Sequence, residues 1–193
     1  GWLPKSSWAV AGQAIMPIYM RMWDEQGARE TSAFITRSLR TYALLAAPVI
    51  AGFASVGPEL LPALASEKYA SAAPIIPWVI AGMVVDGTNS MLGAGLFIHR
   101  KTRVIMSIVL TGAALNIGLN LWLVPRIGIM GAAIATLVSY STTALALCLA
   151  GRRLLPVPLP WLTFLRAGAA AGVMYLCIKH VLPERRLLAA AVR

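Results

Sequence analysis

Long apolar runs with few charged residues constrain this chain more than any other feature. A bilayer core of about 30 Å is crossed by roughly 20 helical residues. Only 12% of the 193 residues are charged, whereas soluble domains carry about 25%. The sequence therefore predicts an all-α fold, a polytopic transmembrane helix bundle. Complete spans are predicted at 41–65, 72–98, 104–124, 128–150 and 162–181, with a partial span at 6–20, a polar loop at 21–40 and a truncated span at 187–193.

Lysine and arginine residues divide unequally between the two sides that these spans define, and the predicted cytoplasmic side carries nine. They are Arg21, Arg29, Arg37, Arg40, Arg100, Lys101, Arg103, Arg152 and Arg153. The other side carries six: Lys5, Lys68, Arg126, Lys179, Arg185 and Arg186. Because cytoplasmic loops of membrane proteins are enriched in lysine and arginine, the loops at 21–40, 99–103 and 151–161 are predicted to face the cytoplasm. The loops at 66–71, 125–127 and 183–186 would face the exterior. The net charge of +10 is thus explained by membrane orientation, and no nucleic acid partner is predicted.

The stretch "NIGLNLWLVPRIGIMGAAIAT" combines amides with a strip of small residues. Asn116 and Asn120 are one helical turn apart and share a face, which must contact protein or water because an amide in hydrocarbon needs a partner. Pro125 and Gly128 predict a sharp turn. The small residues at 128–136 predict close packing with a neighbouring helix, and a second such pair is Gly168–Gly172. Since the connections after residues 65, 98, 124 and 150 are short, consecutive helices should pack as antiparallel neighbours.

This pattern resembles the polysaccharide-transporter branch of the multidrug/oligosaccharidyl-lipid/polysaccharide exporter superfamily, which contains the O-antigen and exopolysaccharide flippases. The segments "AIMPIYMRMWDEQGARE", "APVIAGFASVGPELLPALASEKYASAAPII" and "GLFIHRKTRVI" agree with the resemblance. It implies the C-terminal lobe of a two-lobe flippase in the cytoplasmic (inner) membrane. The implied partners are a lipid-linked glycan substrate, membrane lipids and the N-terminal lobe of the same protein. Since the chain opens and closes within apparent helices, we expect it to be a fragment of a longer protein.

Asp86 is the candidate functional residue that stands out, because a charged side chain at mid-membrane costs about 2.5–3.5 kcal/mol on insertion scales. Asn89 lies three residues later on the same helical face. With Asn116 and Asn120, these residues would line a substrate or ion cavity, where Asp86 binds a coupling cation, a proton or sugar hydroxyls. The alternatives are a structural contact between helices, or a span that is broken at "DGTNS".

Arg37 and Arg40 are candidates for binding the pyrophosphate of a lipid-linked sugar, because the planar guanidinium group binds phosphate oxygens bidentately. The alternative is that they anchor the chain at the cytoplasmic surface. No residue pattern predicts catalysis or a cofactor. The two cysteines, Cys148 and Cys177, lie in apolar runs without metal-ligand spacing, and neither histidine has an acid–base partner at useful spacing. The chain is therefore not predicted to be an enzyme or to bind a metal.

Three other functions remain open. An ion-coupled multidrug or organic-cation exporter of the same superfamily would be expected to place more acidic and aromatic residues toward its cavity. A membrane-embedded enzyme of envelope synthesis would need an acid or histidine constellation in longer loops. A structural subunit would not require Asp86.

Overall fold

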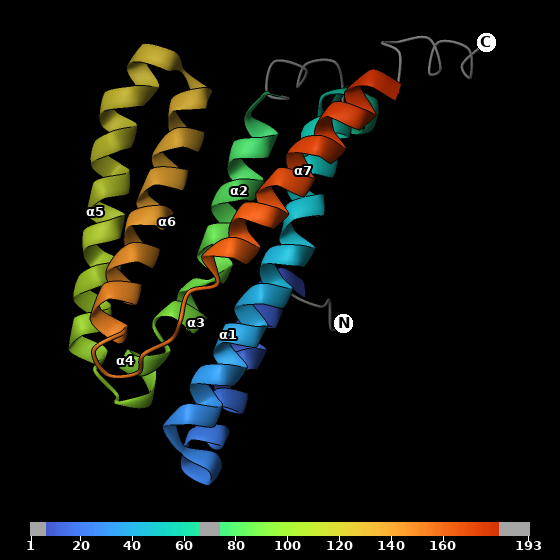
Figure 1. The fold of residues 1–193 in the computed structure, drawn as a ribbon. Helices are drawn as coiled ribbons and strands as arrows, with labels where there is room; N and C mark the ends of the chain where they lie inside the picture. The colour runs from blue at the N-terminus through green and yellow to red at the C-terminus, as the bar shows by residue number, and fades with distance from the viewer. Residues whose placement is uncertain (1–6, 66–73, 182–193) are drawn as a thin grey trace, which may run out of the picture.

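The computed structural model describes residues 7–65 and 74–181, and the side chains of 15–55 and 74–178. All elements within these ranges are helices, which confirms the predicted all-α fold. They are α1 (Ser7–Ala65), α2 (Ile76–Gly87), α3 (Asn89–Leu92), α4 (Ala94–Ile98), α5 (Thr102–Ile127), α6 (Ile129–Gly151) and α7 (Trp161–Val181) (Figure 1). The predicted loops at 66–71 and 183–186 and the truncated span at 187–193 lie outside the described residues.

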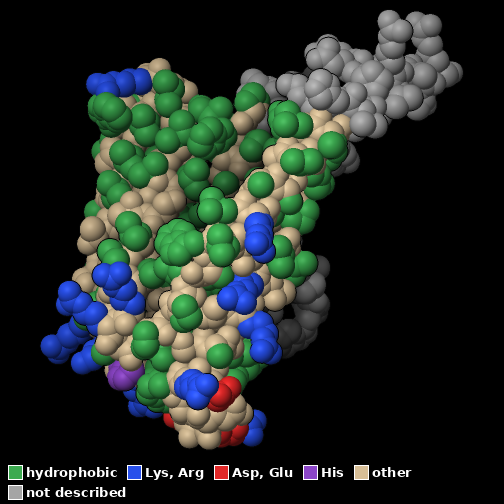
Figure 2. Space-filling model, viewed as in Figure 1, with side chains coloured by type: hydrophobic (Ala, Val, Ile, Leu, Met, Phe, Trp, Pro, Cys, Tyr) green, Lys and Arg blue, Asp and Glu red, His purple; other side chains and the backbone are tan. Residues whose placement is uncertain are grey.

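Four helical segments in the described part of the chain are long and apolar enough to cross a membrane: Ile15–Ser55, Thr102–Ile127, Ile129–Gly151 and Trp161–Ile178. α5 and α7 expose large apolar side chains along much of their length, including Leu110, Leu121, Leu165 and Val173. Figure 2 shows such side chains covering both helices. Contiguous apolar surface on this scale is unfavourable in water and typical of a surface that contacts lipid.

The prediction of a polar loop at residues 21–40 is wrong, because this segment is helical apart from a reversal at Gly27. Gly27 has φ 80° and ψ −172°, a conformation that glycine adopts without a steric penalty. It divides α1 into two arms that lie side by side (Figure 1). Tyr19 of the first arm packs in one buried cluster with Ile35 and Leu39 of the second. The segment contains four Arg, two Glu and two Ala, which favour helices, so its polarity does not interrupt them.

The span predicted at 72–98 is broken, as the alternative for "DGTNS" anticipated. Its residues from 76 to 98 form α2, α3 and α4, with breaks at Thr88 and Gly93. At the first break, the Thr88 amide bonds to the Val85 carbonyl, and the hydroxyl of Tyr42 donates to the Val84 carbonyl at 3.1 Å. The hydroxyl of Tyr19 donates to the Ser90 carbonyl at 3.3 Å. Both arms of α1 thus satisfy backbone groups of the broken helix.

α5 and α6 form the antiparallel hairpin that their short connection predicts. Gly128, with φ 63°, makes the turn alone, since Pro125 lies inside α5. A Cβ atom added at Gly131 would lie 2.7 Å from the carbonyl carbon of Leu123. The small residues at the start of α6 therefore allow the two backbones to approach closely, as the sequence predicts.

α7 does not pack beside α6, contrary to the prediction from their short connection. It packs against α1, and the connecting residues 152–160 cross the molecule to bring it there (Figure 1). This connection is attached to α1, because the hydroxyls of Ser32 and Thr36 donate to the carbonyls of Pro156 and Pro158. The predicted packing role of Gly168 and Gly172 is not observed, since a Cβ atom at either would meet no described atom within 4 Å.

α6 occupies the middle of one side of the fold. It contacts α5 on one flank and α2 and α3 on the other, whereas α2 and α5 do not contact each other within the described residues. A space with α6 as its floor therefore remains between α2 and α5. The turn between the arms of α1, the α4–α5 turn and the α6–α7 connection all lie at one end of the molecule, opposite the α5–α6 turn (Figure 1).

Candidate functional site: a cavity between α2, α5 and α6

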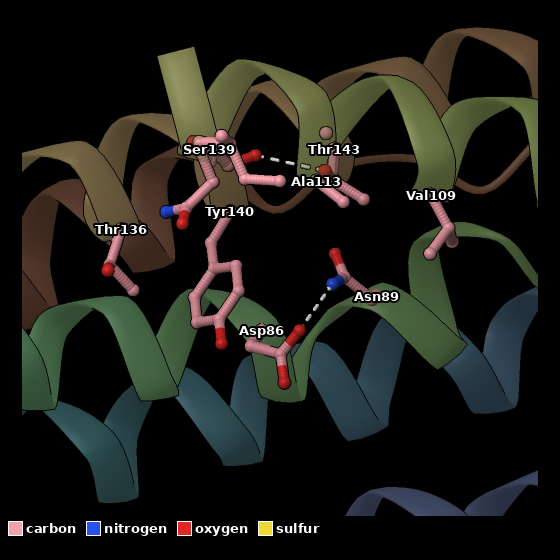
Figure 3. Close-up of a pocket in the computed structure, with 11 residues that line it drawn as sticks. Asp86, Asn89, Val109, Ala113, Thr136, Ser139, Tyr140 and Thr143 are labelled. Carbon is pink, nitrogen blue, oxygen red and sulfur yellow. Dashed lines mark hydrogen bonds between the residues drawn. The ribbon is translucent and has the colours of Figure 1, made fainter. Parts of the chain in front are cut away.

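The space above α6 is a cavity of about 370 Å³. Asp86 and Asn89 contribute from the α2–α3 wall, and Gly112, Ala113 and Asn116 contribute from the α5 wall. The floor consists of Thr136, Ser139, Tyr140 and Thr143 of α6, and Val109 and Ile117 of α5 complete the lining. Figure 3 shows the side chains of Asp86 and Asn89 on one side of the cavity, facing those of α5 and α6 on the other.

The break at Thr88 positions the two polar residues of the α2–α3 wall. Asp86 lies in the last turn of α2, and Asn89 is the first residue of α3. The Asn89 amide Nδ2 donates to Asp86 Oδ1 at 2.8 Å (Figure 3). The Asp86 side chain is exposed in the cavity. A carboxylate among apolar membrane helices needs water or a polar ligand, so we expect the cavity to hold one or the other.

Two residues that line the cavity each carry a buried polar atom with no hydrogen-bond partner in the described structure: Asn89 Oδ1 and Ser139 Oγ. Ser139 is only 2% exposed. The neighbouring hydroxyls of Thr136 and Thr143 donate to the carbonyls of Ala132 and Ser139 in their own helix. Buried polar groups are nearly always hydrogen-bonded, so this part of the lining is not fully satisfied. Both oxygens are covered by neighbouring protein atoms, and a ligand would reach them only after the surrounding side chains move.

Three of the four predicted cavity residues come together here: Asp86, Asn89 and Asn116. Asn120 does not line the cavity. Its Nδ2 donates to the main-chain carbonyl of Asn116 at 2.8 Å and to Asn116 Oδ1 at 3.1 Å. Asn120 is therefore satisfied within α5 and orients the Asn116 side chain from one turn away.

Arg37 and Arg40 lie on the second arm of α1, and both side chains are exposed. Neither lines the cavity, and neither forms an ion pair with the part of the chain that the structure describes. The predicted pyrophosphate site and the cavity are thus at separate places on the molecule.

The α6 floor was missed by the sequence analysis, although the sequence carries a signal for it. Thr136, Ser139, Tyr140 and Thr143 follow an i, i+3, i+4, i+7 spacing, which puts four polar side chains on one face of a helix. The small residues of the same helix instead predicted close packing of its backbone. Read as a polar stripe, this spacing predicts a face that avoids lipid.

The lining offers a carboxylate, amides and hydroxyls, which are groups that bind sugar hydroxyls or a hard cation. No group of three or more His, Cys, Asp or Glu side chains in the described ranges is placed to hold a metal ion. The arrangement is thus suited to reversible binding through oxygen and amide groups.

Comparison with known proteins supports the membrane assignment. Over 135 residues, the chain is 27% identical to an uncharacterized membrane protein of Methanocaldococcus jannaschii. The match covers 67% of this chain and 25% of that protein, so the chain spans about a quarter of its relative's length. No family model matches the sequence, and no solved structure matches the chain. Its long apolar helices and this relative identify the chain as a membrane protein.

Proposed function

We propose that the protein is a multi-pass flippase of the cytoplasmic membrane. It would move a lipid-linked oligosaccharide or polysaccharide precursor from the cytoplasmic to the exterior leaflet for cell-surface polysaccharide synthesis. The resemblance of the Asn116–Thr136 region to polysaccharide transporters supports this function. In that scheme, the described helices form one lobe, and a second lobe of the same protein closes the other side of the cavity. The two lobes rock around the bound glycan while the lipid tail stays in the bilayer.

The observation that carries the proposal is a cavity with a carboxylate, amides and hydroxyls in its lining, among helices with apolar outer surfaces. A protein with only a structural role gains nothing from an exposed carboxylate at Asp86, because it is expensive to insert. The exposed Asp86 carboxylate lines the cavity and can accept hydrogen bonds from sugar hydroxyls.

The runner-up is an ion-coupled multidrug or organic-cation exporter, and Asp86 is the observation that favours it. A pocket for an organic cation gains from several acidic and aromatic side chains. Among the described lining residues, Asp86 is the only acid and Tyr140 the only aromatic residue. The abundance of amide and hydroxyl groups therefore favours a glycan. A membrane-embedded enzyme has less support, since the α5–α6 connection offers little more than Gly128.

Energy for transport would come from an ion gradient, the membrane potential or consumption of the product, since the sequence carries no ATP-binding motif. Asp86 is the residue that would bind a coupling cation or proton. Arg37 and Arg40 would hold the substrate pyrophosphate at the cytoplasmic surface before the glycan enters the cavity. Their exposure and lack of an ion-pair partner in the described structure leave both guanidinium groups available.

Replacing Asp86 with Asn tests the cavity's role. The change removes the charge but keeps the shape, and loss of a charged hydrogen-bonding group corresponds to about a tenfold or greater decrease in transport. The measurement is surface polysaccharide in cells that depend on this protein, together with the amount of protein in the membrane. Asp24→Asn is the matched control, because Asp24 is exposed in the first arm of α1. Normal polysaccharide with Asp86→Asn would refute the proposed role.

The pyrophosphate role of Arg37 and Arg40 is tested by a double substitution to Lys. Lysine keeps the charges that orient the chain but loses the bidentate fork. We expect normal insertion and about a tenfold weaker affinity for the lipid-linked substrate, measured by titration of the purified protein. If the two residues only anchor the chain, the lysine variant would bind as tightly as the parent, whereas substitution by Gln would disturb insertion.

A further inference from the structure

Five exposed cations gather at one end of the α5–α6 hairpin, on residues with no role in the cavity. They are Arg100, Lys101, Arg103, Arg152 and Arg153, called here the hairpin basic cluster. Figure 2 shows lysine and arginine side chains concentrated at this end of the hairpin. None of the five forms an ion pair with an acidic residue in the described part of the chain, where the one observed pair joins Arg21 and Glu25. The cluster therefore has an uncompensated positive charge.

The register of the hairpin explains why these residues lie together. Gly112 faces Thr143, since a Cβ atom on Gly112 would meet Thr143 Oγ1. Arg103 precedes Gly112 by the same number of residues by which Arg152 follows Thr143. In an antiparallel pair, this spacing places the two arginines at the same level. Gly95 of α4 also approaches the Gly151 carbonyl, which brings the α4–α5 turn to the same place.

Arg152 and Arg153 are held in position because the connection that follows them is fixed. Leu155 is 1% exposed, and Ser32 of α1 bonds to the Pro156 carbonyl. The two arginines line an open hollow of about 640 Å³ together with Pro156, Val157 and Pro158. The backbone that carries both arginines is therefore already in place, and a ligand with phosphate oxygens needs to order only their side chains on binding.

The surface next to the cluster is apolar and exposed. Val104 and Met106 follow it along α5, and Leu145 and Leu149 precede it along α6. A ligand that uses both surfaces needs an anionic head and hydrocarbon chains.

We propose that the hairpin basic cluster is a binding site for an acidic membrane phospholipid. The phosphate contacts Arg103, Arg152 and Arg153, and the acyl chains lie along the α5–α6 hairpin. Basic pockets at the cytoplasmic ends of membrane helices bind anionic headgroups through this combination of forces.

The test measures lipid binding to the intact protein purified in an uncharged detergent. Phosphatidylglycerol and phosphatidylcholine with identical acyl chains are titrated, and bound lipid is counted by native mass spectrometry. We expect phosphatidylglycerol to bind more tightly. Replacing Arg152 and Arg153 with Gln should weaken its binding by roughly 30-fold, given the usual contribution of each cation near an anionic headgroup. Phosphatidylcholine binding should not change.

A matched pair of single variants on α5 provides the control. Arg103→Gln removes a cation at the cluster and should weaken phosphatidylglycerol binding roughly fivefold. Arg126→Gln removes one at the other end of the same helix, where Arg126 lies over the Trp122 ring, and should leave it unchanged. If both variants lost phosphatidylglycerol binding equally, the proposed site would be wrong. Equal affinity of the parent protein for the two lipids would also contradict it. Displacement of the lipid by millimolar inorganic phosphate would show a site for free anions and also overturn the proposal. Arg152→Lys/Arg153→Lys keeps both charges and should retain most of the binding, which separates charge loss from misfolding.

Discussion

Replacing Gly131 with Ala should lower the free energy of unfolding by about 3 kcal/mol, near the upper end of the usual cost of overpacking. The new methyl group would lie 2.7 Å from the Leu123 carbonyl carbon, 2.8 Å from its oxygen and 2.9 Å from the Val124 nitrogen. All three are backbone atoms of α5, so no side-chain rotation can relieve the contact. The two helices must separate at the end of the hairpin that carries Gly128. Unfolding in mixed micelles with increasing SDS measures the effect.

Gly118→Ala is the control for this prediction. Gly118 lies inside α5, and a Cβ atom there would meet no described atom within 4 Å. Alanine favours a helix over glycine by about 0.5–1 kcal/mol, so this variant should be as stable as the parent or slightly more stable. If Gly131→Ala proves as stable as Gly118→Ala, the close approach of α5 and α6 is wrong.

Replacing Ala113 with Phe should reduce transport by about 10- to 100-fold, in proportion to an overpacking cost of 1–3 kcal/mol for the bound ligand. Ala113 lines the α5 wall of the cavity and is exposed (Figure 3). A benzyl group at this position fills space between α5 and the Asp86 wall without entering a packed helix interface. Surface polysaccharide and the amount of protein in the membrane are measured together.

The matched variant is Ala114→Phe. Ala114 is the next residue on α5, is also exposed and does not line the cavity. It adds the same bulk on a different face of the helix, so transport should remain normal. Equal transport by the Ala113→Phe and parent proteins would show that the cargo does not occupy this cavity. Loss of transport in both variants would point to a general effect on the helix.

Several features followed from the sequence alone because they depend on spacing within one helix. The apolar runs at 104–124 and 128–150 predict α5 and α6 closely, since roughly 20 apolar residues have few structures available to them in a bilayer. The hydrogen bond between Asp86 and Asn89 follows from their three-residue spacing even though a break separates α2 from α3, because Thr88 keeps helical backbone angles. The prediction that Asn116 lies near these two residues rested on the rule that amides avoid lipid, and all three line the same cavity. Membership of the polysaccharide-transporter branch stays a prediction.

The tertiary structure decided which helices are neighbours. Short connections predicted that α7 would lie beside α6, yet residues 152–160 carry it to α1, because burial of Leu155 and the bonds from Ser32 and Thr36 fix the connection there. The same long-range packing places Ser139 on the cavity floor and groups Arg103 with Arg152. Spacing along a chain determines which side chains share a helical face. Which helical faces pack against each other depends on how well their surfaces fit, and those surfaces come from distant parts of the chain. The local sequence therefore cannot predict this packing.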